Sequence, residues 1–227
     1  MTTRDRLLRV AAEEFAAKGF QEATVAEICR KAEANIAAIN YHFGGKEALY
    51  QETWRQAHRA MLEAVPPDGG VAATAPAAQR LRGRLRAMLQ RGMHPDDREF
   101  RIMDREMVNP TGLLAQVVHD SIEPLRRATE SIVLELLGGN ADERTVRLCG
   151  ASVIGPCLFV MRGRRLGRHV DAPPSGGTTE VDELADHFTA FALAGIQDVR
   201  RRLAKSQARP ARAGRKAGTT KAKRGEP

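Results

Sequence analysis

Residues 24–50 read TVAEICRKAEANIAAINYHFGGKEALY, and the fold of the first part of the chain can be worked out from this stretch. Thr24, with Glu27 three residues later, predicts a capping box, in which each side chain satisfies a backbone N–H at a helix start. Apolar residues then recur at helical spacing and give this helix one buried face: Val25, Ile28, Cys29 and Ala32. The helix is short, because Glu33-Ala34 breaks the pattern.

A second short helix is predicted over residues 35–43. Ile36, Ile39 and Phe43 recur at i, i+3 and i+7, so these three side chains are expected to point inward. The outward face then carries small residues followed by polar and aromatic ones: Ala37, Ala38, Asn40, Tyr41 and His42. Gly44-Gly45 ends this helix. Lys46 begins a further one, whose apolar face includes Tyr50, Trp54, Ala57 and Met61.

A first helix precedes these elements and is expected to end near Gly19, a natural C-cap residue. Its apolar stripe is Leu7, Leu8, Ala11, Ala12 and Phe15. Two short helices joined by a tight turn form a helix-turn-helix, and small residues at the tip of the second let it enter the major groove of DNA closely. Such an outline also occurs in proteins that bind no DNA, so the outline alone leaves the function open.

The same stretch, 24–50, resembles the DNA-binding domain of the TetR family of bacterial repressors. The resemblance implies a three-helix DNA-binding head, a larger all-helical body for ligand binding and dimerisation, and no enzymatic activity. The residues that fall where the family contacts DNA are Thr24, Asn35, Ala37, Ala38, Asn40, Tyr41, His42 and Lys46. The turn carries Glu33 where the family usually has Gly. A non-glycine residue in left-handed geometry costs about 1 kcal/mol, so the turn is expected to be strained or slightly reshaped.

Composition sets limits on the class of protein. The chain has 227 residues, 42% of them hydrophobic, and so can build one large or two modest domains. The N-terminus lacks the apolar region of a signal peptide, and no long uncharged stretch predicts a membrane span. We therefore expect a cytoplasmic protein without membrane contact. Its three cysteines, Cys29, Cys149 and Cys157, are expected to be reduced core residues.

The net charge of +8 is concentrated at the C-terminus. Residues 1–50 are balanced and residues 51–205 nearly so, whereas residues 206–227 hold seven Lys/Arg against one Asp/Glu. This last segment has no large apolar residue and is predicted to be a disordered basic tail. The sequence thus predicts a DNA-binding domain at 1–50, an effector-binding and dimerisation domain at 51–205, and the tail.

The body is predicted to be helical over residues 77–93, 97–109, 111–137 and 142–167, with a bend or break before Pro124. Residues 65–76 are rich in Pro and Gly and predict a loop. The segment REFRIMDREMVNPTGLL, residues 98–114, resembles the body of a subgroup related to the CecR-type repressors. A last helix, residues 181–203, carries an unbroken apolar stripe.

Dimerisation is predicted through the last two helices. Residues 148–161 contain no charge, so this helix needs cover on all sides, and a second copy of the chain can supply part of it. The expected interface residues are Val153, Cys157, Phe188, Phe191, Gly195, Ile196 and Val199. The alternative is that these two helices pack only within their own chain and form no interface with a second copy.

Candidates for a small-molecule effector site are Phe100, Met103 and Met107, spaced i, i+3 and i+7, together with His119. Methionine adapts to varied ligands, but ordinary core packing explains the same pattern. Scattered histidines, cysteines without metal-ligand spacing and the lack of a Gly-rich phosphate loop argue against an enzyme, a metal or a cofactor. The alternative function is a sequence-tolerant architectural DNA-binding protein, whose affinity the basic tail would supply.

Overall fold

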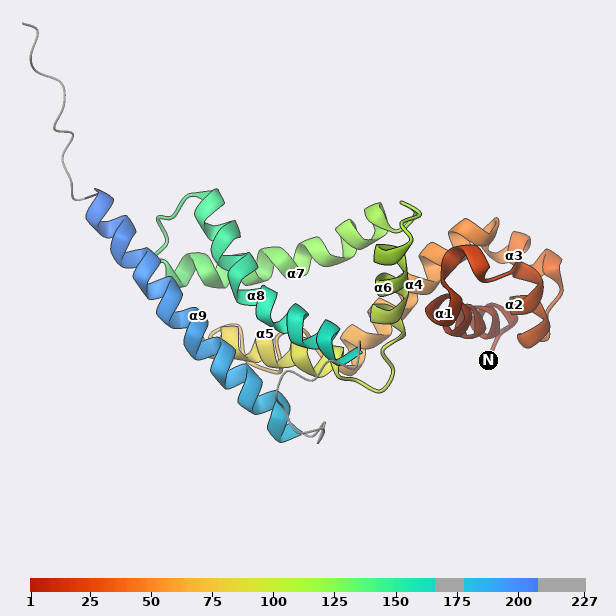
Figure 1. The fold of residues 1–227 in the computed structure, drawn as a ribbon, viewed down its shortest axis with the longest axis horizontal. Coiled ribbons are helices and arrows are strands. Elements are labelled where there is room, and N and C mark those ends of the chain that lie inside the picture. The colour runs from red at the N-terminus through yellow and green to blue at the C-terminus, as the bar shows by residue number, and fades with distance from the viewer. Residues whose placement is uncertain (166–177, 208–227) are drawn as a thin grey trace, which may run out of the picture.

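The structure, a computed structural model, describes residues 1–165 and 178–207. Within these two ranges the chain forms nine helices and no strand, which confirms the predicted all-α fold. The helices are α1 (Thr3–Glu22), α2 (Val25–Lys31), α3 (Ile36–Phe43), α4 (Lys46–Ala64), α5 (Ala77–Gly92), α6 (Arg98–Val108), α7 (Ala115–Leu136), α8 (Glu143–Arg165) and α9 (Thr178–Gln207). Figure 1 shows α1, α2 and α3 gathered at one end of an elongated molecule, with α5, α8 and α9 toward the other.

The boundaries agree with most of the sequence predictions and correct two of them. Turns occupy the predicted loop between α4 and α5. The basic tail was predicted from residue 206, but α9 continues through Gln207, so Ser206 and Gln207 are helical. The rest of the predicted tail, 208–227, and the end of the helix predicted to reach 167 lie outside the described residues.

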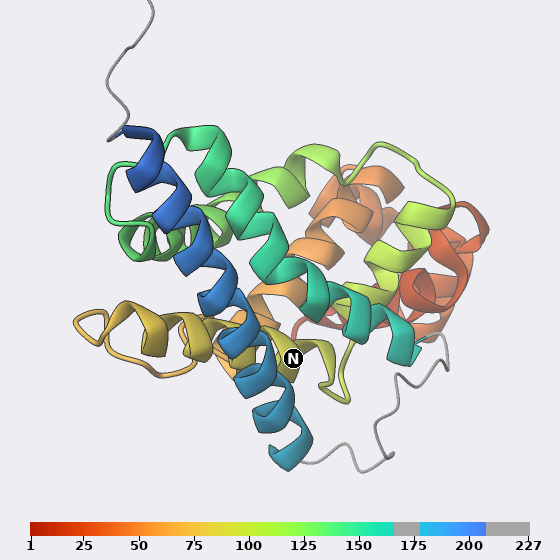
Figure 2. The same cartoon turned by 60° about the vertical axis from the view of Figure 1, so that its left-hand side comes forward.

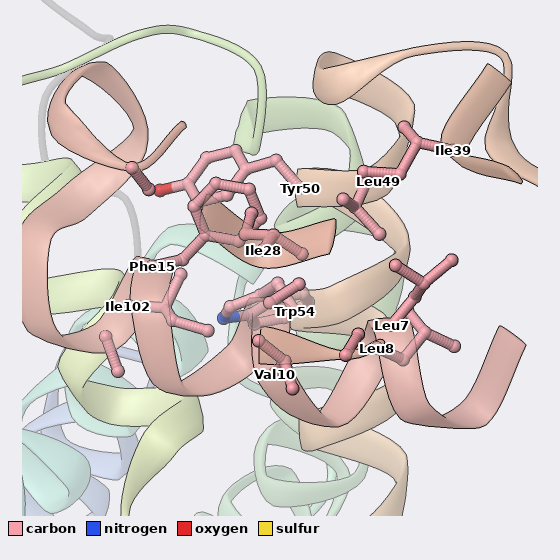
Figure 3. Close-up of a cluster of buried hydrophobic side chains, with 14 of the residues drawn as sticks. Leu7, Leu8, Val10, Phe15, Ile28, Ile39, Leu49, Tyr50, Trp54 and Ile102 are labelled. Carbon is pink, nitrogen blue, oxygen red and sulfur yellow. The ribbon is translucent and has the colours of Figure 1, made fainter. Parts of the chain in front are cut away.

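One hydrophobic cluster holds the N-terminal helices together. It joins residues of α1, α2, α3 and α4 around Trp54, whose side chain is 1% exposed. Phe15 packs edge-on against Tyr50, with the ring centroids 4.8 Å apart (Figure 3). Ile102 of α6 and Leu114 and Val117, at the start of α7, belong to the same cluster. The head core therefore includes residues of the body.

Polar contacts reinforce this junction between head and body. The Tyr50 hydroxyl donates to Glu106 Oε2 at 3.1 Å. The Glu106 carboxylate also accepts hydrogen bonds from the backbone N–H groups of Thr111 and Gly112, at 2.9 and 3.0 Å. Because α4 runs from Lys46 to Ala64, it crosses the predicted domain boundary at residue 50 without a break.

A second cluster forms the core of the body. It takes residues from α5, α7, α8 and α9, with Leu81, Leu85 and Leu89 of α5 fully buried. Figure 2 shows α8 and α9 crossing in front of the other body helices. Val153, Cys157 and Ile196 lie inside this cluster, with exposures of 3%, 0% and 3%. The prediction that these three face a second subunit is therefore wrong, since contacts within the same chain already cover them.

The three cysteines are free thiols, as predicted. Cys29 and Cys157 are buried, and burial raises the pKa of the Cys157 thiol to about 12. Cys149 is only half-buried. At neutral pH the Cys157 thiol stays protonated and is a poor nucleophile.

Helix α7 continues through Pro124, so of the bend or break that the sequence predicted before this proline, the break is absent. Its N-terminal end places Val117 in the head cluster, and its C-terminal end places Ile132 and Val133 in the body cluster. Anchoring at both ends offsets the one backbone hydrogen bond that a proline removes. The continuous helix therefore links the two cores directly.

The turn between α2 and α3 adopts the strained geometry expected from its sequence. Glu33 has φ 50°, and it is the one non-glycine residue with positive φ among those described. Replacing Glu33 by Gly should remove this cost and raise the free energy of unfolding by about 1 kcal/mol. Urea unfolding monitored by circular dichroism measures the difference.

The matched control is Glu13→Gly, at an exposed position inside α1 with ordinary helical geometry. There glycine is expected to destabilise by about 1 kcal/mol, because it adds backbone freedom to the unfolded chain. Two changes of the same sign would contradict the strain attributed to Glu33.

Candidate DNA-binding interface

The two helices of the predicted helix-turn-helix begin at capping residues. The Thr24 hydroxyl accepts from the backbone N–H of Glu27 at 3.2 Å, and Asn35 Oδ1 accepts from that of Ala37 at 2.9 Å. Asn35 is exposed. Both residues were predicted to contact DNA, and both lie at a helix N-terminus, where backbone dipoles favour phosphate.

The predicted capping box at Thr24 is only half present. The Glu27 carboxylate does not return to the Thr24 backbone, because it binds Lys18 at 2.5 Å and Lys31 at 3.5 Å. Lys18 and Lys31 also bind the buried Glu14 of α1. A complete capping box stands instead at the start of α1, between Thr2 and Asp5. The ion pairs hold α2 against α1 and so fix the base of the interface.

Helix α3 is attached to the head core mainly through Ile39, which is 1% exposed. Phe43 is half-buried against the core and lies beneath the Arg4 guanidinium, whose carbon is 5.4 Å from the ring centroid. Ile36 is 54% exposed, so the prediction that it points inward is wrong. Ala38, predicted to face outward, is half-buried and packs against the core. Eight residues are too few for periodicity alone to fix the direction of the first turn.

These placements predict unequal effects for two similar substitutions. Ile39→Ala should lower the free energy of unfolding by about 2–4 kcal/mol, since it leaves a cavity in the head core. Ile36→Ala should cost less than about 1 kcal/mol, because this side chain is already half in solvent. Thermal unfolding of both variants measures the difference. Equal losses of stability would show that Ile36 is packed in the core as Ile39 is.

The outward surface of α3 carries Ala37, Asn40 and Tyr41, all of them exposed, and the exposed fraction of Tyr41 is 85%. The ring of His42 is half-buried and meets the Tyr41 ring edge-on, with centroids 4.9 Å apart. Exposed Ile36 extends this surface at the N-terminal tip, and the sequence reasoning missed it. Apolar side chains at such a tip can contact the methyl group of thymine.

The N-terminus of α4 lies next to the end of α3. Gly44 ends α3 in left-handed geometry, with φ 83°, and Gly45 precedes α4 without a side-chain cap. Backbone N–H groups in the first turn of α4 therefore remain available to an anion. Lys46 Nζ lies 4.4 Å from the centroid of the Phe20 ring and 3.5 Å from the carbonyl oxygen of Gln21. These contacts hold the ammonium group beside the helix terminus.

The predicted effector residues do not gather in one place. Phe100 lines a cavity in the body, enclosed mainly by α5, α6, α7 and α8. Met103 instead packs against the head cluster. Met107 is 49% exposed and contacts Arg162, and His119 is exposed on α7. The prediction of a shared site for these four residues is wrong, because the stripe of α6 faces two different cores along its length.

Comparison with protein families assigns the two parts of the chain. Residues 7–53 match the model of the bacterial regulatory proteins of the tetR family. Residues 77–196, more than half of the chain, match the C-terminal domain of the HTH-type transcriptional dual regulator CecR. This chain belongs to the TetR family, with a body of the CecR type. The resemblances seen in residues 24–50 and 98–114 are thereby confirmed.

Individual relatives agree with this assignment. An uncharacterized HTH-type transcriptional regulator of Bacillus subtilis, YdgC, is 35% identical over 72 residues. That match covers 30% of this chain and spans only 37% of the length of YdgC.

Solved structures support the same fold over most of the chain. A transcriptional regulator of Pseudomonas aeruginosa PAO1 is similar with a TM-score of 0.68 and 19% identity, over 88% of this chain and 92% of its own. A TetR-like regulator from Rhodococcus sp. RHA1 has a TM-score of 0.63 and 20% identity, over 86% of this chain and 96% of its own. The TetR-family regulator PfmR of Thermus thermophilus has a TM-score of 0.60 and 22% identity, over 85% of this chain and 96% of its own.

Membership in the TetR family makes this protein a regulator of transcription that binds DNA through its helix-turn-helix. The fold and the family are those of transcriptional regulators rather than of enzymes. Among the described residues, no group of three or more His, Cys, Asp or Glu side chains is arranged to hold a metal ion.

Proposed function

We propose that this TetR-family protein is a sequence-specific repressor that binds its operator as a homodimer and releases it when a small molecule enters the body. The observation that carries the proposal is the position of α3. Its exposed face is fixed by Ile39 in a core that also includes Ile102 and Val117 of the body helices. A rearrangement in the body can therefore reposition the DNA-binding surface.

In the proposed complex, α3 enters the major groove. Ala37 and Asn40 would lie near base edges, and Ile36 joins them at the tip. Tyr41 and His42 would donate to phosphate oxygens, as would backbone groups at the N-terminus of α4 beside Lys46. Thr24 and Asn35 would contact the backbone from the starts of α2 and α3. Phosphate contacts set affinity and position, whereas base contacts set sequence preference.

The proposed dimer uses apolar side chains that the single chain leaves uncovered on α8 and α9. Leu148, Leu158 and Phe159 on α8 are 58%, 50% and 68% exposed, and Phe191 on α9 is 73% exposed. Exposed apolar surface of this extent on adjoining helices is typical of a protein interface. Of the interface residues predicted from sequence, Phe188, Phe191, Gly195 and Val199 remain candidates, since they are exposed or half-buried.

Helix α8 also meets the length and composition required to cross a bilayer over Glu143–Arg164, with 33% of its apolar window buried in the chain. In the proposed dimer, the partner subunit covers the apolar surface of α8 that the same chain leaves exposed. Co-sedimentation of the wild-type protein with phospholipid vesicles would instead favour a membrane.

The proposed effector site is the cavity that Phe100 lines, with a volume of about 420 Å³. This volume lies within the about 300–1,000 Å³ typical of small-molecule sites. The cavity reaches His58 on α4, the helix that continues into the head core. A ligand shifts the protein between two states only by its differential affinity for them, so occupancy must favour a head spacing that does not fit the operator.

Selection of purified full-length protein on random DNA duplexes tests the sequence specificity. We expect one preferred palindromic motif, bound at least about a thousandfold more tightly than random duplex at physiological salt. A ratio near one would favour the alternative of an architectural DNA-binding protein.

A further inference from the structure

The cavity in the body has an apolar wall and one strongly basic corner. Met88, Phe100, Leu125 and Ile154 supply apolar side chains from four different helices. Arg84 and Arg91, seven residues and so about two turns apart on the same face of α5, supply two guanidinium groups. His58 closes the corner from α4.

The hydrogen-bond pattern of this corner is incomplete. Arg91 Nη1 and His58 Nε2 are buried atoms without a hydrogen-bond partner, and His58 as a residue is only 6% exposed. The other ring nitrogen of His58, Nδ1, lies 2.7 Å from Glu99 Oε1. A buried polar atom left without a partner costs free energy, so its retention beside a cavity points to a ligand that completes the bond.

The charges of the corner are also unbalanced. Arg84 donates to the Thr129 hydroxyl at 3.0 Å and to the carbonyl oxygen of Leu125 at 2.7 Å, both uncharged acceptors. Among the described residues, no carboxylate lies within ion-pair distance of Arg84 or Arg91; Glu99, which binds His58, acts on Arg91 only from farther away, as Asp68 does on Arg84. Burial lowers the pKa of both guanidinium groups, so the surroundings disfavour their charge. One added negative charge would balance the site.

The arginines at the mouth of the cavity differ in this respect. Arg126 pairs with Glu123 at 2.6 Å, and Arg147 pairs with Glu143 at 2.7 Å. Their charges are compensated within α7 and α8. The unmatched positive charge is therefore confined to the inner corner, where a ligand would be enclosed.

We propose that this cavity binds an amphipathic organic acid, with its carboxylate at Arg91 and His58 and its apolar body against Leu125, Ile154 and Phe100. The inference rests on the proposed function, since it names the chemical class of the effector. A carboxylate can accept from the guanidinium of Arg91, and such charge-assisted bonds are about twice as strong as neutral ones. His58, which is held by Glu99 through Nδ1, lines the same corner through the rest of its ring.

Matched probes test the charge preference by calorimetry on the full-length protein without DNA. Decanoate, 1-decanol and decyltrimethylammonium share a chain and differ in head group, and 2-naphthoate with 2-naphthol supplies a ring-shaped pair. We expect at least one carboxylate to bind about tenfold or more tightly than its alcohol, and the cation not to bind. If neither carboxylate is preferred over its alcohol, the proposal is wrong.

Arg91→Met should reduce the preference for a carboxylate over its alcohol to about onefold. In the absence of ligand it should raise Tm by about 3 °C, because it removes a buried charge that has no ion-pair partner. A merely structural arginine would lower Tm when replaced. Arg86→Met is the matched control on α5, since Arg86 pairs with Asp182 at 2.7 Å. It should keep the carboxylate preference.

Arg91→Gln provides the same charge removal should the methionine variant fail to fold. An unchanged preference in either folded variant would exclude Arg91 as the anchor. Gel shifts in the presence of the bound acid form a separate measurement. If the acid binds selectively but does not release the operator, the proposed release mechanism is wrong and the proposed ligand class stands. If only uncharged compounds release the operator, the release mechanism stands and the proposed ligand class is wrong.

Discussion

The double variant Phe159→Glu/Phe191→Glu should be a monomer that binds operator at least a hundredfold more weakly than the wild type. Both side chains are mostly exposed in the single chain, so the substitutions leave each core intact. In the proposed dimer they would bury four carboxylates in an apolar seam, at a cost of several kcal/mol. Linked half-site binding contributes about 10²–10⁴ to affinity, and a monomer loses it.

Sedimentation velocity gives the assembly state, and gel shifts give the affinity. Gln197→Glu is the control, because it adds the same charge at another exposed position of α9 and should leave the dimer unchanged. A double variant that stays dimeric would remove the α8 and α9 surface from the interface.

Replacing Tyr41 and His42 together by Ala should weaken binding to operator and to random duplex by a similar factor. Each side chain is proposed to donate to a phosphate, and hydrogen bonds to charged groups are worth about 1.5–3 kcal/mol. The pair is therefore expected to cost about a hundredfold or more. Tyr41 is 85% exposed and His42 half-buried, so the fold should survive the change.

Ala37→Gln provides the contrast to this variant. Position 37 lies at the exposed tip of α3, where a longer polar side chain would meet base edges. It should change the preference at one base pair by about 1–3 kcal/mol while leaving non-specific affinity intact. Were the Tyr41/His42 variant folded, dimeric and as tight a binder as the wild type, this surface would not be the DNA interface.

Helix positions and the head core followed from the sequence because they depend on local signals. The stripe of Leu7, Leu8 and Phe15, the glycines after Phe43 and the loop at 65–76 all lie where periodicity and turn residues predicted them. The strain at Glu33 could also be anticipated, since the turn needs left-handed backbone and lacks glycine. Each of these depends on near neighbours in the chain.

Features that depend on packing between distant segments could not be read in this way. Val153, Cys157 and Ile196 look the same in sequence whether other helices of the same chain or a second subunit cover them. The residues of the cavity proposed as the effector site come from five helices, and Arg91 becomes unusual only because no acid pairs with it among the described residues. Of the four effector residues predicted from α6 and α7, only Phe100 lines this cavity.

The shared core between head and body limits how this protein can be recombined. Ile102, Leu114 and Val117 lie outside the segment 7–53 that matches the family's DNA-binding model, yet they complete its hydrophobic cluster. A graft of residues 1–53 onto another regulator would leave Phe15 and Tyr50 facing unsuited neighbours. Exchange of operator specificity between relatives therefore requires either co-transfer of α6 with the start of α7, or substitution confined to the outer surface of α3.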